Sequence, residues 1–146
     1  MDDIPERLTT KPSWLITQLA VHARRLASEG FAAAGARGYH YRILSTLREF
    51  GPASQADLGR RGRIDRKDMV TAVKQLAEQG YVDRVPDPDH GRRNRVTLTE
   101  SGLRQLQRMD GLLDRVQDDL LAPLSPEDRR TLTELLGRVL AHHEPR

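Results

Sequence analysis

The sequence predicts a mainly α-helical chain that carries one small β-hairpin. Apolar residues recur at three- and four-residue spacing over most of the 146 residues, which is the pattern of amphipathic helices. Residues 81–85 and 94–98 differ, because they alternate apolar and polar positions and flank a Pro-Asp-Pro-Asp-His-Gly turn. The length suits one structural domain, and a hydrophobic share of 37% supplies material for a core.

Two helices are expected in the first third of the chain. Residues 12–30 and 39–50 have helical spacing. The segment 31–38 between them is rich in Ala and Gly, which indicates a break or a loose helix end. Gly51-Pro52 then ends the second helix.

A short helix, a turn and a longer helix should follow. Ser54, with Asp57 three residues later, forms a capping box that begins the short helix. The turn is expected at Gly62. Asp65 caps the longer helix in the same way, and Gly80 ends it.

The helix expected over 65–80 has two different faces. One is an apolar stripe formed by Met69, Val70, Val73, Leu76 and Ala77. Lys67, Thr71 and Lys74 lie together on another face, with Arg66 near the helix start. Such a helix can simply have a solvated face. It can also enter a DNA major groove, where Arg, Lys and hydroxyl side chains read base edges.

The hairpin that follows carries a basic tip. Arg92, Arg93 and Arg95 lie within four residues, and they repel one another unless something negative neutralises them. Arginine suits the narrow, electronegative minor groove. Helix, turn, helix and hairpin in this order form a winged helix-turn-helix. The combination favours double-stranded DNA as partner over a solvated surface or a protein-interaction module.

Two helices are expected in the last third, and they favour a homodimer. Thr99 should cap a long helix to about Leu121, and Ser125 should begin a last helix. The long helix carries a heptad-like seam of Leu106, Met109, Leu113, Val116 and Leu120. The seam can pack within the chain, but the terminal helices have more apolar surface than a small DNA-binding module covers. The residues expected at the dimer interface are Leu15, Leu19, Leu106, Met109, Leu113, Val116, Leu135 and Val139.

Other function classes find little support in the sequence. It has no cysteine, which excludes disulfides, thiolate metal sites and cysteine nucleophiles. No apolar run approaches the ~18 residues of a membrane span, and the acidic start is not a signal peptide, so we expect a cytoplasmic protein. No phosphate loop, metal motif or nucleophile elbow appears. We therefore expect no enzyme, cofactor or metal, and we interpret His142-His143 as a solvent-exposed helix end.

Four segments of the chain resemble the MarR family of bacterial transcription regulators. They are residues 54–59, 64–70, 76–84 and 92–102. The last is the most specific, because the hairpin runs into a Leu-Thr-x-x-Gly sequence that ends at Gly102. The resemblance implies three parts of one structural domain. They are N-terminal dimerisation and support helices (1–53), a winged helix-turn-helix (54–99) and C-terminal dimerisation helices (100–146).

The resemblance implies a homodimer on a pseudo-palindromic operator, most commonly acting as a repressor. Helix 65–80 would read the major groove, and Arg92 would insert in the minor groove. The family usually has an Asp two residues before that arginine. Here His90 takes the position, so either Asp89 braces the wing or the brace is absent. The residues expected at the DNA are Ser54, Gln55, Arg66, Lys67, Asp68, Thr71, Lys74, Arg92, Arg93 and Arg95.

The resemblance also implies a small effector. Many family members release DNA when a small phenolic or anionic aromatic ligand binds between the dimerisation helices and the DNA-binding lobe. The absence of cysteine excludes the peroxide sensing of one branch of the family. In this chain the corresponding side chains are Trp14, His22, Tyr39, His40 and Tyr41, with Arg42 beside them.

Overall fold

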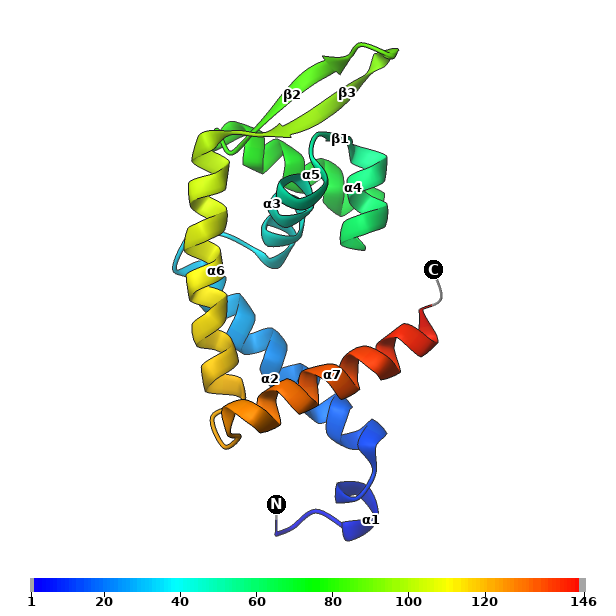
Figure 1. Ribbon diagram of the computed structural model, residues 1–146, viewed down its shortest axis with the longest axis vertical. Coiled ribbons are helices and arrows are strands. Elements are labelled where there is room, and N and C mark those ends of the chain that lie inside the picture. The colour runs from blue at the N-terminus through cyan, green and yellow to red at the C-terminus, as the bar shows by residue number, and fades with distance from the viewer. Residues whose placement is uncertain (1, 145–146) are drawn as a thin grey trace.

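The computed structural model describes residues 2–144, and for residues 90–93 it describes the backbone alone. The predicted fold class is confirmed: the chain is mostly helical, with a small antiparallel sheet in the order β1-β3-β2 (Figure 1). The elements are α1 (Glu6–Thr9), α2 (Pro12–Ala32), α3 (Gly38–Phe50), β1 (Ala53–Ser54), α4 (Gln55–Gly62), α5 (Arg66–Glu78), β2 (Val82–Asp87), β3 (His90–Leu98), α6 (Glu100–Leu120) and α7 (Pro126–His143).

The elements form a lobe and a set of long helices that extend from it. Helices α3, α4 and α5 pack together under the sheet, and the β2–β3 hairpin projects from this lobe (Figure 1). Helix α6 leaves the lobe and runs beside α2. The Gln105 and Arg108 side chains of α6 donate to the last carbonyls of α2 and its following turn, those of Ala34 (3.1 Å) and Ala33 (3.0 Å). These bonds fix the α2–α3 connection to α6.

The helix starts follow the predicted caps. In each case a side-chain oxygen accepts from the backbone N–H three residues later, at 2.9 to 3.1 Å. The capping residues are Ser54, Asp65, Thr99 and Ser125. Local sequence therefore determines where α4, α5, α6 and α7 begin.

The turn between α4 and α5 differs from the prediction. Gly62 belongs to α4, and Arg63 instead has the left-handed backbone, with φ 54° and ψ 52°. A Cβ on Gly62 would lie 3.4 Å from the Ile64 side chain, an ordinary van der Waals contact, so neither the turn nor the packing requires glycine there. The Arg63 carbonyl accepts from Arg42 Nη1 (3.4 Å), which ties the turn to α3.

The sheet is larger than predicted. β1 has two residues, too few for an alternating pattern, and it pairs with β3 through Ala53–Val96 and Ser54–Arg95. β2 continues to Asp87 with an irregularity after Pro86, so the hairpin turn is shorter than expected. The Asp87 carboxylate accepts from the Asp89 N–H (2.9 Å) and shapes this turn.

The root of the hairpin explains the Leu-Thr-x-x-Gly sequence. The Thr99 hydroxyl donates to the Gly80 carbonyl (2.7 Å) and accepts from the Gly102 N–H (2.9 Å). A Cβ on Gly102 would lie 2.0 Å from the Tyr81 carbonyl oxygen. Glycine is required here because the start of α6 touches the backbone that leads into β2.

The core lies in the lobe and at the top of α6. Its fully buried large side chains are Ile43, Leu44, Leu58, Met69, Val73, Leu76, Val82, Val96 and Met109. Phe31 is also buried, because α2 continues to Ala32 rather than ending near Gly30. Val70, which was predicted on the apolar stripe of α5, is instead 51% exposed, and Ala72 is buried on the same helix. Phe50, the last residue of α3, is 61% exposed.

The predicted seam on α6 needs correction. Leu106, Met109 and Val116 are buried within the single chain, so they cannot form the contact between two copies. The reason is that α2 of the same chain lies along α6, where Val116 approaches Gly30 so closely that a Cβ there would lie 2.7 Å away. Leu113 is partly buried against the same core.

Helix α7 has the opposite character. None of its residues, all of which the structure describes, is buried. Leu135, Leu136, Val139 and Leu140 are exposed large hydrophobic residues. Within the part of the chain that the structure describes, every helix is too short or too polar to span a bilayer.

Candidate DNA interface

Helix α5 presents a basic and polar face outward. It is anchored from within by Met69, Val73 and Leu76, which are buried in the lobe. Arg66, Lys67, Thr71 and Lys74 are all exposed, as the sequence predicted. The Thr71 hydroxyl donates to the Lys67 carbonyl (3.3 Å), so it can accept a bond from a partner but its proton is already used.

The basic stretch of α4 and α5 divides into paired and unpaired cations. Arg60 binds Asp57 (3.1 Å), and this hydrogen bond lowers the pKa of the Asp57 carboxyl. Arg61 lies over the Phe50 ring, 4.1 Å from its centroid, and Arg63 pairs with Glu144 at the end of α7. Among the described residues, the cations of α5 form no ion pair. They therefore remain available to an anionic partner.

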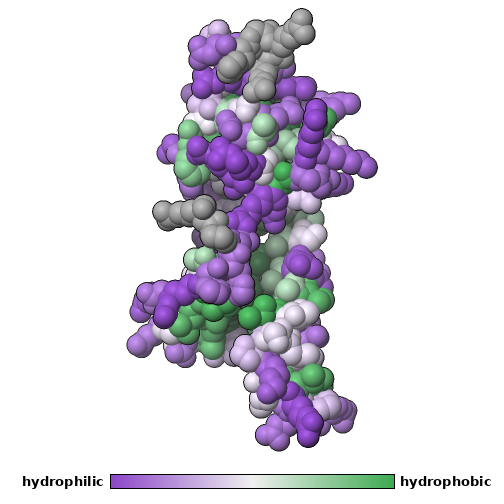
Figure 2. Space-filling view, turned by 90° about the vertical axis from the view of Figure 1, so that its right-hand side faces the viewer, coloured by the Kyte–Doolittle hydropathy of each residue, from purple (hydrophilic) through white to green (hydrophobic). Residues whose placement is uncertain are grey.

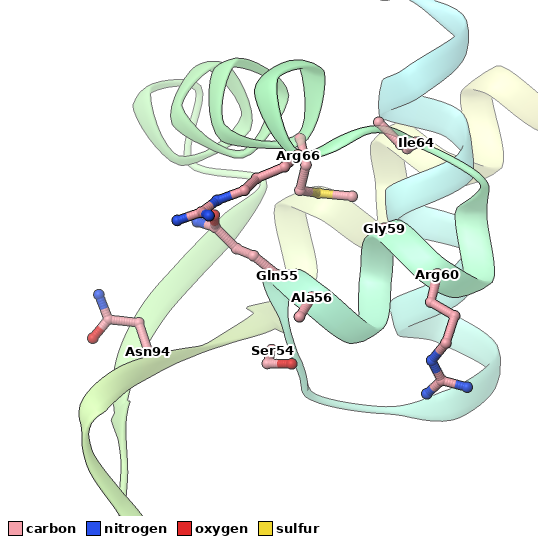
Figure 3. A pocket seen from close by; sticks show the side chains of 9 residues that line it. Ser54, Gln55, Ala56, Gly59, Arg60, Ile64, Arg66 and Asn94 are labelled. Atoms are coloured by element: carbon pink, nitrogen blue, oxygen red, sulfur yellow. The ribbon is translucent and has the colours of Figure 1, made fainter.

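A hollow of about 690 Å³ lies between the starts of α4 and α5 and the middle of β3 (Figure 3). Its lining includes Ser54, Gln55 and Arg66, three residues predicted at the DNA, and also Asn94. Figure 3 shows Gln55 and Arg66 directed toward the same open space, with Asn94 facing it from the strand. The hollow therefore collects hydrogen-bonding groups from four elements, β1, α4, α5 and β3, at one place.

Asn94 was missed by the sequence reasoning. It lies on the same face of β3 as the buried Val96, because alternate residues of a strand share a face. This alternation is the signal that could have found it. Arg95, which was predicted at the DNA, lies on the other face of the strand opposite Val85 and is half-buried.

Asp68 is placed differently from the other predicted contacts. It is half-buried, and its carboxylate lies beside the Tyr39 hydroxyl, where the hydrogen bond raises the pKa of Tyr39. Asp68 therefore faces the start of α3 rather than the open face of α5. A carboxylate facing outward there would repel phosphates, so this placement favours an anionic partner.

The basic tip of the hairpin is only partly visible. The side chains of Arg92 and Arg93, like that of His90, lie outside the described part of the structure. The strands that carry them project well beyond the helices of the lobe (Figure 1). The tip thus lies at the end of a two-stranded arm, where the chain turns between Asp87 of β2 and the start of β3.

The predicted effector residues do not form one cluster within the chain. Trp14 and His22 lie in the first half of α2. Tyr41 stacks on Phe31 near the end of α2, with ring centroids 5.4 Å apart. At about 1.5 Å rise per residue, Trp14 lies roughly 25 Å and His22 roughly 13 Å from Phe31 along the helix. Tyr39 is exposed beside Asp68 and Arg42.

His40 and Tyr41 have structural roles that account for them. His40 is 4% exposed, and burial lowers its pKa. Its Nδ1 accepts from the Arg37 N–H (3.3 Å), so its Nε2 carries the proton that is donated to Gln75 Oε1 (3.0 Å). The Tyr41 hydroxyl donates to Asp110 (2.7 Å), and burial together with this bond raises the pKa of Tyr41 to about 12.

Known proteins share both the sequence and the fold. The sequence profile described as "MarR family" matches residues 36–93. An uncharacterized HTH-type transcriptional regulator of Bacillus subtilis, YdgJ, is 31% identical over 97 residues, which cover 66% of this chain and 59% of that protein. The chain thus matches about three fifths of this curated relative's length.

Two solved structures match nearly the whole chain. The crystal structure of a probable transcriptional regulator from Pseudomonas aeruginosa has a TM-score of 0.77 and 30% identity, covering 90% of this chain and 98% of that one. The PcaV transcriptional regulator of Streptomyces coelicolor, solved with its natural ligand, has a TM-score of 0.75 and 27% identity, covering 99% and 100%. This chain belongs to the MarR family of transcriptional regulators.

Proposed function

We propose that this protein regulates transcription by binding a double-stranded DNA operator as a homodimer. Helix α5 would lie in a major groove and the β2–β3 hairpin would reach the adjacent minor groove. One observation carries the proposal: the cations of α5 are exposed and form no ion pair among the described residues, and one of them, Arg66, lines the polar hollow beside the helix.

The hollow fits the DNA backbone. A major groove and its neighbouring minor groove are separated by one sugar–phosphate strand. If α5 lies in the first groove and the hairpin tip in the second, that strand must pass between them, over the hollow that Ser54, Gln55, Arg66 and Asn94 line. Hydroxyl, amide and guanidinium groups are the donors that proteins use for phosphates.

The dimer would form through the long helices. Figure 2 shows hydrophobic side chains gathered in the lower half of the molecule, around α2 and α7, away from the lobe. The exposed apolar residues of these two helices include Ile16, Leu19, Leu135, Leu136, Val139 and Leu140. A second copy would cover them and would place two lobes on the half-sites of a pseudo-palindrome. Leu15, which is half-buried, belongs to the same proposed interface.

The lobe that binds DNA would include α3. We propose this change to the boundary at residue 53, because α3 packs against both α4 and α5. Its His40–Gln75 bond also joins it directly to the groove-reading helix.

Release of the operator by a small phenolic or anionic aromatic molecule is a further part of the proposal, with repression as the resting state. Its support is that PcaV was solved with a natural ligand. Trp14 and His22 could reach such a ligand only between two copies, since they lie far along α2 from Tyr39. His40 and Tyr41 are already bonded inside the chain.

The test is binding of labelled random duplex DNA, measured by fluorescence anisotropy at several salt concentrations. The protein should bind in low salt, and log K should fall linearly with log salt, because phosphate contacts release counterions. Arg92→Ala should weaken binding strongly without changing the dimer. Lys74→Ala should weaken all sequences about equally, whereas Lys11→Ala, at the start of α2, should change nothing. Absence of binding in low salt would overturn the proposal.

A further inference from the structure

Val70 is exposed on the helix that would read the groove. The apolar spacing of α5 predicts that it is buried, yet 51% of its surface is accessible. Among the α5 side chains, all of which the structure describes, it is the only apolar one that is exposed. The helix packs through Met69, Val73 and Leu76 without it.

The neighbours of Val70 place it on the basic face. Arg66 and Lys74 lie one turn before and one turn after it, and Thr71 is adjacent; all three are exposed. The Thr71 proton is used by the Lys67 carbonyl. The centre of this face therefore combines an isopropyl group with a hydroxyl that can only accept, and cations surround both.

Base-edge chemistry limits what Val70 can recognise. The major-groove edges of the four base pairs present hydrogen-bond donors and acceptors and one apolar group, the 5-methyl of thymine. An isopropyl group makes no hydrogen bond. We infer that Val70 contacts a thymine methyl and thereby selects a thymine in each operator half-site. The inference rests on the proposed function, because it requires α5 to lie in a major groove.

An exposed valine can also be without function, since single apolar residues are common on surfaces. Local structure gives no reason for this one. Valine has a lower helix propensity than alanine, lysine or glutamine, and residue 70 contributes nothing to the buried face of α5. Val85, which is 42% exposed on β2, is a matched residue on a different element.

The test removes the methyl group and nothing else. Duplexes selected from a random pool by the full-length protein are resynthesised with deoxyuridine in place of each thymidine in turn. Affinity is then measured by fluorescence anisotropy at fixed salt. One position in each half-site should lose about fourfold in affinity, the effect of one methyl-sized group leaving an apolar contact, and roughly fifteenfold when both half-sites are changed.

Variants assign the effect to Val70. Val70→Ala should bind the thymidine and deoxyuridine duplexes equally. Val85→Ala should keep the full difference, because the thymine methyl lies in the major groove and the hairpin does not. Circular dichroism melting should show that both variants are folded, as expected for exposed sites.

The possible outcomes separate the two proposals. If the protein binds DNA but no thymidine-to-deoxyuridine change matters, or if the difference persists in Val70→Ala, the inference is wrong and the DNA-binding function stands. A pool that yields no preferred sequence also overturns it. If the protein binds no duplex at all, the proposed function itself is wrong.

Discussion

Helices α5 and α7 have similar apolar spacing and opposite surroundings. α5 buries Met69, Ala72, Val73 and Leu76 inside the lobe, whereas α7 buries none of its residues. The hydrogen bonds and ion pairs that join α7 and the residue after it to the rest of the chain are those of Arg129 with Asp118 (2.8 Å), Arg129 with the Leu124 carbonyl (3.2 Å) and Glu144 with Arg63. Exposed ion pairs of this kind contribute little to stability. The lobe thus buries its own apolar face, whereas the apolar face of α7 stays exposed in the single chain, which is the observation behind the proposed dimer.

The largest expected effect is on the free energy of unfolding, and it should differ between the buried leucine of α5 and an exposed leucine of α7. Leu76 is 1% exposed and Leu136 is 45% exposed. Leu76→Ala should lower the free energy of unfolding by about 3 kcal/mol, because it leaves a cavity in the lobe. Leu136→Ala should have a smaller effect that depends on protein concentration, since it acts on association. Urea unfolding at two protein concentrations measures both. Equal losses that do not vary with concentration would mean that α7 has no partner.

A charge on α7 should break the dimer and leave the lobe folded. Val139 is 54% exposed in the single chain, and Val139→Glu would bury an unpaired carboxylate between two copies. We expect the dimer affinity to fall by about 2 to 3 kcal/mol or more, seen as a monomer mass by light scattering at micromolar protein. Val85→Glu adds the same charge to the hairpin and should remain dimeric. A dimeric Val139→Glu would contradict the proposed interface.

The hollow allows a smaller and more specific test. Asn94→Ala removes a neutral amide, so DNA binding should weaken by about 1 kcal/mol per subunit on every sequence. The slope of log K against log salt should stay the same, because no counterion is released by a neutral group. Arg66→Gln is the matched comparison and should reduce that slope by about 0.9 per subunit, or about 1.8 for the dimer. If Asn94→Ala changes sequence preference instead, Asn94 reads a base rather than a phosphate.

The smallest expected effect is a pH dependence of the lobe. Burial lowers the pKa of His40 below its ordinary value, and the Arg37 charge acts in the same direction. The unfolded chain therefore binds a proton more readily than the folded one. The stability from neutral His40 should be complete above about pH 6.5 and decrease as the pH falls below it. Urea unfolding between pH 7.5 and 5 should show this loss, and His40→Gln should reduce it while the exposed His22→Gln retains it.

Much of the fold could be predicted from the sequence, because the patterns that determine it extend over only a few residues. The caps at Ser54, Asp65, Thr99 and Ser125 act within four residues, so the sequence alone was sufficient for those helix starts. The glycine of the Leu-Thr-x-x-Gly sequence was recognised as a motif, but its cause, contact with the Tyr81 carbonyl, is tertiary. β1 could not be predicted from the sequence, because two residues are too few to show an alternating pattern.

The candidate site was predicted in part for the same reason. Arg66, Lys67, Thr71 and Lys74 are exposed as the helical period requires. Asn94 joins Gln55 and Arg66 only because β3 passes beside α4 and α5. His40 and Tyr41, predicted at an effector, are used inside the chain by Gln75 and Asp110. The chemistry of a His or Tyr side chain does not by itself show whether it binds a ligand or a residue of the same chain.

The sequence by itself determined the order of the elements apart from the short α1 and β1, most helix boundaries, the family and the outward cations of α5. The tertiary structure decided what each apolar face meets. It placed the α6 seam against α2 of the same chain, left α7 uncovered and exposed Val70. The physical reason is that periodicity defines a face of a helix within a few residues, whereas burial depends on which distant segment packs against that face.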